Sequence, residues 1–312
     1  MCGQQMKSTI ADIPRHSKTP VPILCYHSID TTGSLLSTSP RVFSNHMLHL
    51  KRHGYTTLTF GDLVDRLSAK TLMPPKLAVI TFDDGYRNNR EIALPILKRY
   101  GFTATFFVVT DAVGKRASWI ERDFSTVLGW AREGGHTGRL SENHRKIFKS
   151  RNAYLASLDK TALRKELEKL VLVGHFPLMS FSELSILSSH GFEIGAHSHT
   201  HPFLAELTEN DVYKEARRSK EMLQNRLRPP VTSFCYPSGN YSTNVAHIVA
   251  TLGYSGACTT ERSSVSPSNH NIYALPRLLM HDSYDAHKFR LCLSRWFPLY
   301  VFAQIIWKRV KQ

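Results

Sequence analysis

Short apolar runs alternate along the chain with segments whose apolar residues recur every three or four positions. The short runs are rich in β-branched residues and predict buried strands, whereas the longer segments predict helices with one apolar face. The clearest run is Leu77 to Phe82, which lies between Pro75 and Gly85. Strands and helices alternate about eight times, a pattern typical of parallel α/β proteins. We therefore expect a distorted or incomplete parallel (β/α) barrel of seven to eight strands, with its chemistry at the carboxyl ends of the strands.

The alternation assigns most of the chain to individual elements. The expected strands cover residues 23–26, 55–58, 77–82, 102–109, 192–196, 231–236, 254–259 and 274–280. The expected helices of the barrel cover residues 40–54, 60–69, 88–100, 181–191, 208–227 and 245–252. Two of these helices carry clear boundary signals, because Ser180 and Glu183 form a capping box and Gly101 follows the last turn of another helix.

Residues 111–175 interrupt this alternation and predict a helical insertion, for which one interpretation is a lid over the site. Its expected helices cover residues 119–132, 142–158 and 160–173. The insertion lies within a domain that we place at residues 21–290. We expect residues 1–20 to form a flexible leader, because they are polar and lack periodicity. Residues 291–312 predict an amphipathic C-terminal tail.

Basic residues outnumber acidic ones by 40 to 25, which gives a formal net charge of +15. Such a charge suits an anionic partner such as nucleic acid, an acidic membrane surface, or a phosphorylated or acidic glycan. The basic residues are scattered through the expected helices, and no zinc-finger or RNA-binding motif is present in the sequence. Nucleic acid is therefore the least expected of these partners.

The tail contains an aromatic and apolar stretch, Trp296 to Trp307, followed by a basic end. About a dozen residues are too few to span a bilayer. Two interpretations stay open at this point. The stretch lies in a membrane interface with its basic end on anionic headgroups, or it is a terminal helix packed on the barrel.

The five cysteines are widely spaced and form no Cys-x-x-Cys pair. This spacing favours free thiols in a reducing compartment over a cysteine zinc site. The first 20 residues lack the apolar core of a secretory signal. We accordingly expect the protein in the cytoplasm or on the inner face of the cytoplasmic membrane.

Polar clusters follow several expected strands. These clusters are His27, Asp83 with Asp84, the segment from His197 to His201, and the turn from Pro237 to Tyr241. An Asp-Asp-Gly sequence alone is equally typical of a solvated turn. Because the carboxyl ends of parallel strands meet at one edge of a barrel, the clusters together favour a site. Two adjacent carboxylates at a buried strand end need neutralising partners.

A metal is one such partner. His197 and His201 are four residues apart, and on a helical turn this spacing places both imidazoles on one side. One carboxylate from Asp83 or Asp84 would complete a site with two histidines, one carboxylate and an open position, the composition of catalytic zinc sites. Since successive side chains of a strand diverge, we expect one aspartate to bind metal and the other to act as a base. His199 is expected to point elsewhere, either exposed or behind the ligands.

Two motifs carry a specific resemblance. The segments Thr81-Phe82-Asp83-Asp84-Gly85 and His197-Ser198-x-x-His201-Pro202 resemble the polysaccharide deacetylase family, carbohydrate esterase family 4 with its NodB homology domain, over roughly residues 20–290. The resemblance implies that Asp83 is the general base and that Asp84, His197 and His201 bind a divalent metal, most commonly Zn²⁺.

The third family motif departs from its usual form. Cys235 stands where the family has an arginine that pairs with the base, and Ser238 stands where an aromatic residue is usual. The resemblance implies that the Ser238 backbone N–H donates to the oxyanion. We hypothesise that Arg277 replaces the missing arginine. Tyr26-His27 resembles the N-terminal motif of permuted members, such as those that deacetylate poly-N-acetylglucosamine, which implies that His27 is the general acid.

The resemblance therefore implies a hydrolase that removes an N-acetyl group from a sugar of a glycan, an oligosaccharide or a lipid-linked saccharide. Two alternatives remain from the sequence. One is a metal-dependent deacylase for a formyl or O-acetyl group, and the other is a non-catalytic barrel that binds glycan or membrane. The positive charge and the aromatic tail favour a lipid-linked or phosphorylated precursor at the inner membrane face.

Overall fold

The computed structural model describes residues 20–120, 122, 160–268, 270–294, 296–297 and 299–301. The leader, the end of the C-terminal tail and most of the predicted insertion, including the helix expected at 142–158, lie outside these residues. None of the helices in the described part is long and apolar enough to cross a membrane.

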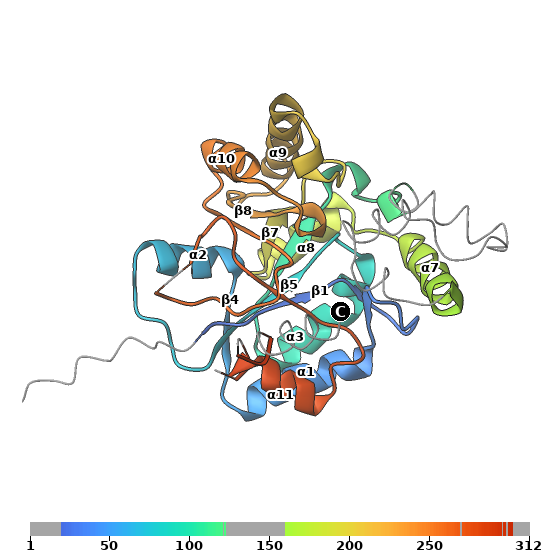
Figure 1. The fold of residues 1–312 in the computed structure, drawn as a ribbon, viewed down its shortest axis with the longest axis vertical. Coiled ribbons are helices and arrows are strands. Elements are labelled where there is room, and N and C mark those ends of the chain that lie inside the picture. The colour runs from blue at the N-terminus through green and yellow to red at the C-terminus, as the bar shows by residue number, and fades with distance from the viewer. Residues whose placement is uncertain are drawn as a thin grey trace, which may run out of the picture.

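Parallel strands form one curved sheet in the order β10, β1, β5, β6, β7, β8, β9, and β4 pairs with the first half of β5 (Figure 1). Their bounds are β1 (Ile23–Tyr26), β4 (Thr56–Leu58), β5 (Leu77–Phe82), β6 (Thr105–Val108), β7 (Glu193–Ala196), β8 (Ser233–Cys235), β9 (Gly256–Cys258) and β10 (Leu278–Leu279). Two short strands, β2 (Ser28–Ile29) and β3 (Ser37–Thr38), pair separately. Each strand of the main sheet lies within a predicted strand, although most are shorter.

One segment joins the two edges of this sheet. Leu275 forms a parallel bridge with Cys258 of β9, and its N–H donates to the Ala257 carbonyl. Directly afterwards, Leu278 of β10 pairs with Leu24 of β1. The same stretch of chain thus contacts the last and the first strands of the sheet. The predicted distorted (β/α) barrel is confirmed.

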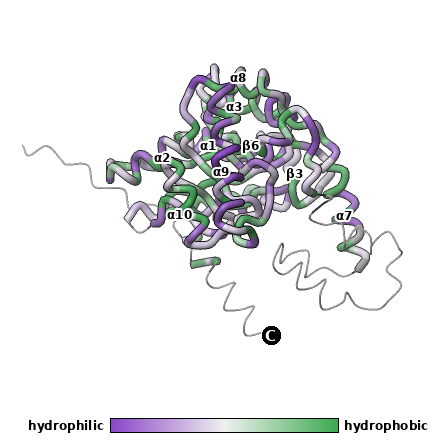
Figure 2. The backbone as a smooth tube through the Cα atoms, turned by 90° about the horizontal axis from the view of Figure 1, so that it is seen from above, coloured by the Kyte–Doolittle hydropathy of each residue, from purple (hydrophilic) through white to green (hydrophobic). Residues whose placement is uncertain are grey.

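Helices cover the outside of the sheet, with α9 and α10 on one side and α1, α3 and α11 on another (Figure 1). The helices are α1 (Pro40–Arg52), α2 (Phe60–Ser68), α3 (Leu94–Tyr100), α7 (Lys160–Gly174), α8 (Phe181–Ser189), α9 (Glu209–Gln224), α10 (Thr243–Thr251) and α11 (Ala286–Cys292). Short turns of helix lie at η1 (Asn89–Ala93), η2 (Thr110–Ala112), η3 (Leu204–Glu206) and η4 (Pro237–Gly239). Hydrophilic and hydrophobic stretches alternate along the outer helices, as the sequence pattern predicts (Figure 2).

Local signals set several of these boundaries. Ser180 and Glu183 form the predicted capping box of α8. Gly101 ends α3 in the left-handed conformation with φ of 70°. The helix expected over 88–100 begins with a π-helical turn, η1, before it continues as α3. Buried residues continue beyond position 290, because Cys292 and Phe297 belong to the main core.

A half-buried carboxylate lies at the amino end of β7, opposite the strand ends that carry the polar clusters. Glu193 accepts hydrogen bonds from the Gly61 N–H at 2.9 Å, from Thr105 Oγ1 at 2.7 Å and from Ser233 Oγ. Burial raises its pKa. These donors join α2, β6, β7 and β8 at the floor of the barrel.

Helix α11 is attached to α1 through a buried histidine. The His46 ring stacks on Phe289 at a centroid distance of 3.9 Å. Its two nitrogens lie 2.9 Å from Tyr26 Oη and 2.7 Å from the Tyr284 carbonyl. Since a carbonyl only accepts, Nε2 carries the proton and Nδ1 accepts from the tyrosine. Burial lowers the pKa of His46 from its ordinary 6.5 to about 4.

This histidine is expected to make folding stability depend on pH. Between about pH 6.5 and pH 4 the unfolded chain binds a proton at position 46 that the folded protein does not, so the free energy of unfolding falls as the pH falls. In His46→Gln, the loss of stability between pH 7.5 and 4.5 should be smaller by about 2 kcal/mol. Denaturant unfolding at the two pH values measures this difference. Replacement of the exposed His53 by Gln is the matched control, and an equal effect in both variants would contradict the assignment.

Candidate active site

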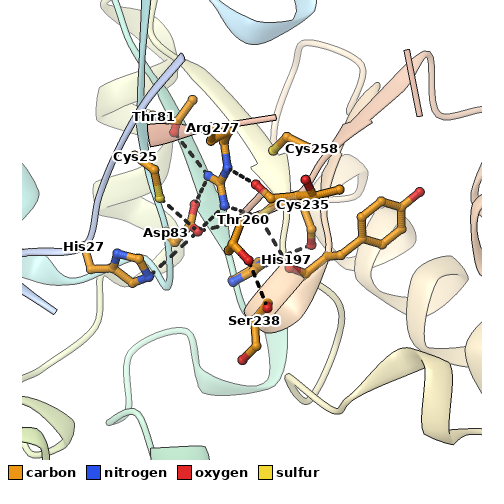
Figure 3. Close-up of polar contacts among 12 residues, drawn as sticks. Cys25, His27, Thr81, Asp83, His197, Cys235, Ser238, Cys258, Thr260 and Arg277 are labelled. Atoms are coloured by element: carbon orange, nitrogen blue, oxygen red, sulfur yellow. Dashed lines mark hydrogen bonds and ion pairs between the residues drawn. The ribbon is translucent and has the colours of Figure 1, made fainter. Parts of the chain in front are cut away.

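Most of the predicted site residues follow strands of the sheet, and Figure 3 shows five of them close together: His27, Asp83, His197, Ser238 and Arg277. His27 follows β1, Asp83 and Asp84 follow β5, and His197 follows β7. Arg277 directly precedes β10, which pairs with β1. The order of strands in the sheet therefore explains why residues from both ends of the domain meet.

Asp84, His197 and His201 form the first part of the site. Asp84 Oδ1 lies 3.6 Å from His197 Nε2 and 3.7 Å from His201 Nε2, and all three residues are buried. Their ligand atoms lie within 4.8 Å of one another. Two imidazole nitrogens and one carboxylate oxygen directed at one point are a donor set that fits a divalent ion such as Zn²⁺.

Hydrogen bonding fixes the tautomer of His197. Its Nδ1 lies 2.8 Å from the Cys235 carbonyl, which can only accept, so Nδ1 carries the proton. In the neutral imidazole Nε2 then carries the lone pair and faces Asp84, as metal ligation requires. For His201, burial first and then the charges of His197 and Arg122 hold the pKa well below its ordinary value, which keeps this imidazole neutral.

His197 and His201 do not meet through a helical turn, and this part of the prediction is wrong. The segment between them is a loop in which Ser198 and His201 have positive φ values of 60° and 58°. The Ser198 hydroxyl accepts from the His201 N–H at 3.0 Å and closes the loop. His199 points away from the ligands, as predicted, and is buried with Nδ1 at 2.9 Å from Thr110 Oγ1.

Asp83 and Arg277 form the second part of the site. The guanidinium donates to Asp83 Oδ1 at 2.7 Å and to Oδ2 at 2.6 Å, and the exposed fractions of the two side chains are 2% and 1%. The remaining donors of Arg277 reach the Thr259 carbonyl, Thr81 Oγ1 and Cys235 Sγ. Burial alone would raise the pKa of Asp83, but the charge and hydrogen bonds of Arg277 outweigh it and hold the pKa well below its ordinary value.

Asp83 also contacts two thiols. Sγ of Cys25 lies 3.5 Å and Sγ of Cys235 lies 3.6 Å from Asp83 Oδ2, on opposite sides of the carboxylate (Figure 3). Burial raises the pKa of both thiols well above the ordinary value, so both are protonated donors.

A cation at Asp83 would compete with Arg277 for the same oxygens. The group around Asp84 is accordingly the better metal site.

His27 lies next to Asp83. Its Nε2 is 3.9 Å from Asp83 Oδ2, and 13% of its side chain is exposed. Burial lowers the pKa of His27 to about 4, with Asp83 opposing the shift and Arg277 and His197 adding to it. The imidazole is therefore neutral near pH 7.

Ser238 lies in a strained turn after β8. It has φ of 54° and ψ of 16°, and Gly239 follows with φ of 68°. Thr260 Oγ1 donates to the Ser238 carbonyl at 3.2 Å, and a Cβ atom at Gly239 would collide with Thr260. Non-glycine residues with positive φ cluster at functional sites. The oxyanion role of the Ser238 N–H stays a prediction.

Several contacts of the site were not anticipated from the sequence. Trp119 stacks on His201, and Glu215 accepts hydrogen bonds from the loop that contains His201. A tryptophan in an insertion and a glutamate in a charged helix carry no motif signal. Cys25 could have been found, because it lies two residues before His27 on the same strand face.

Comparisons with known proteins identify relatives of this chain. The chain is 27% identical over 270 residues to YxkH of Bacillus subtilis (strain 168), whose name assigns it provisionally to the polysaccharide deacetylases, covering 86% of this chain and 75% of that protein. It is 24% identical to the poly-beta-1,6-N-acetyl-D-glucosamine N-deacetylase of Staphylococcus aureus (strain MSSA476), covering 83% and 72% of the two chains.

A solved structure shares the fold. The Streptococcus pyogenes deacetylase PplD in complex with acetate superposes with a TM-score of 0.64 at 20% identity, covering 89% of this chain and all of that one. The sequence model of the polysaccharide deacetylase family matches residues 70–257. That match is more than half of the chain and includes Asp83, Asp84, His197 and His201, and the chain therefore belongs to the polysaccharide deacetylase family.

Proposed function

We propose that this protein is a metal-dependent N-deacetylase that removes the acetyl group from an N-acetylated sugar of a glycan or a lipid-linked saccharide. The observation that carries the proposal is that two adjacent carboxylates have different partners. Arg277 binds both oxygens of Asp83, whereas Asp84 faces two histidines. This arrangement supports a base and a metal ligand side by side.

Asp84, His197 and His201 would hold the metal, and we propose Zn²⁺, because nitrogen and carboxylate donors with an open position suit that ion. A divalent metal bound there supplies Lewis acidity toward water and the acetyl carbonyl. The second nitrogen of His197 is bound to the Cys235 carbonyl, which orients the ring as such partners do in metal sites.

The proton transfers fall to Asp83 and His27. Asp83 stays ionised at neutral pH and takes a proton from the attacking water. His27 is neutral before the reaction, so the proton that it delivers to the leaving nitrogen must be acquired during turnover. Asp83, at 3.9 Å, is the nearest source. The proton from water thus reaches the amine through Asp83 and His27, and acetate and a free amino sugar are released. The Ser238 N–H would stabilise the oxyanion.

The substrate class rests on the relatives and on charge. The named activity of the Staphylococcus aureus relative, on poly-beta-1,6-N-acetyl-D-glucosamine, supports an N-acetylhexosamine polymer or a shorter saccharide. The net charge of +15 favours a substrate that is phosphorylated, lipid-linked or held at an anionic surface.

Asp83→Asn should abolish the base while it leaves the metal ligands in place. We expect acetate release from N-acetylglucosamine oligomers to fall at least about 100-fold, with metal content unchanged. His201→Ala should instead lower metal content and activity together, and chelation of the wild-type protein should act in the same way. Elemental analysis and an acetate assay measure these effects.

The matched control is Glu221→Gln, since Glu221 pairs with Arg217 on the exposed face of α9. Its activity should equal that of the wild type. A metal-loaded wild-type protein that releases acetate from no N-acetylated saccharide would refute the proposed function.

Arg277→Gln should shift the pH dependence of activity. Without the guanidinium, the main opposition to burial is lost and the pKa of Asp83 rises, so the base is protonated over more of the acidic range. We expect lower activity with an acid limb that moves to higher pH, and partial recovery as the pH rises. Profiles of kcat/KM between about pH 4.5 and 8 measure this shift. Arg277→Lys keeps the charge and should show a smaller shift, and an unmoved acid limb in both variants would contradict the pairing role.

We also propose that the C-terminal tail contacts the inner face of the cytoplasmic membrane. In the described part of the tail, Trp296 and Leu299 are 57% and 59% exposed beside the buried Phe297. Residues 302–312 lie outside the described structure.

Replacement of both Trp296 and Leu299 by Ser should reduce co-sedimentation with anionic phospholipid vesicles, because it removes the apolar surface that would enter the interface. The matched control is Leu172→Ser, at a residue that is 51% exposed on α7. Equal sedimentation of the wild type and the double variant would argue for the alternative, a tail packed on the barrel.

A further inference from the structure

The segment that begins the insertion contacts the loop that carries His201. The Trp119 ring stacks on the His201 imidazole with a centroid distance of 4.8 Å and an interplanar angle of 21°. Trp119 is 5% exposed, so its own position is fixed by packing. The stacked rings limit rotation of His201 about its side-chain bonds.

Arg122 holds the backbone of the same loop. Its Nη1 donates to the Thr200 carbonyl at 3.0 Å, and its Nη2 donates to the His201 carbonyl at 2.7 Å. The two donors of one planar guanidinium thus bind consecutive carbonyls, which fixes the orientation of the peptide between them. Arg122 is itself exposed, so its replacement leaves no buried charge.

Glu215 of α9 binds backbone N–H groups of the same loop. Its carboxylate accepts from the His199 and Thr200 N–H groups at 2.9 and 2.8 Å and from Thr200 Oγ1 at 2.8 Å. An acidic side chain therefore holds the N–H groups of the loop, and a basic one holds its carbonyls. His201 has a positive φ of 58°, a conformation that persists in a non-glycine residue only when its surroundings enforce it.

We propose that Arg122 and Trp119 are positioning residues that hold His201 in the orientation needed to bind a divalent metal. The inference rests on the metal site of the proposed function and extends it to the first turn of the insertion. The described start of the segment after β6 thereby becomes part of the support of the metal site. Residues that orient metal ligands typically change metal affinity about 10- to 100-fold when they are replaced.

Arg122→Gln tests the role of the guanidinium. We expect the affinity for Zn²⁺, measured by competition with a chromophoric chelator, to fall roughly 10-fold or more. The absorption spectrum of the Co²⁺-loaded protein should change, because the position of His201 sets the ligand geometry. Arg122→Lys should resemble Arg122→Gln, since one ammonium group cannot replace the planar fork at two carbonyls. Trp119→Phe, which keeps an aromatic face, should lower the affinity less.

Lys115→Gln is the matched control. Lys115 lies in the same segment and pairs at the surface with Asp111. Its removal should leave Zn²⁺ affinity and the Co²⁺ spectrum unchanged. Thermal unfolding of all variants in the presence of a chelator should match the wild type, which separates positioning of the ligand from a general loss of stability.

Wild-type Zn²⁺ affinity and an unchanged Co²⁺ spectrum in Arg122→Gln would overturn the inference. The same holds if metal-free Arg122→Gln unfolds at a lower temperature by an amount that accounts for the whole loss of binding. Neither result bears on the proposed activity, which fails instead if the metal-loaded wild type releases no acetate.

Discussion

The buried ion pair between Asp83 and Arg277 is the interaction on which the rest of the site depends. A carboxylate with an exposed fraction of 2% is tolerable only because the guanidinium binds both of its oxygens. The pair also joins β5 to the segment that connects β9 with β1, so the charge that keeps Asp83 ionised also lies where the sheet closes. Removing one partner would strand a buried charge, at a typical cost of about 3–5 kcal/mol. The site and the closure of the barrel are therefore not independent features.

Local patterns in the sequence predicted much of the fold. The apolar run ending at Phe82, the capping box at Ser180 and the glycine at position 101 all appear as expected, because strand burial and helix ends depend on neighbouring residues. The placement of polar clusters after the strands also brought Asp84, His197 and His201 together, since parallel strands share one carboxyl edge. The prediction that the two histidines lie together was correct, but the reason given for it was wrong. A loop with positive φ values brings them together, and not a helical turn.

The features that could not be predicted from the sequence depend on contacts between residues far apart in the chain. The partner of Asp83 is 194 positions away, and only a hypothesis drawn from family resemblance connected the two. The contacts of Trp119 and Arg122 with the His201 loop, and the carboxylate of Glu193 at the barrel floor, carry no periodic or motif signal. The family match covers residues 70–257 and leaves out both His27 and Arg277. These two residues reach Asp83 because β1 pairs with β5 on one side and with β10 on the other.

The distance along the chain between Asp83 and Arg277 has a consequence for how the protein is made. During synthesis the central strand and its carboxylate leave the ribosome long before the arginine that neutralises it. Closing a loop of 194 residues is a late and entropically costly step. A nascent chain that ends before β10 would have to keep Asp83 hydrated or protonated. Asp83 can thus become ionised and buried only after Arg277 has been translated, so a product truncated before Arg277 would lack this ion pair even with Asp84, His197 and His201 present.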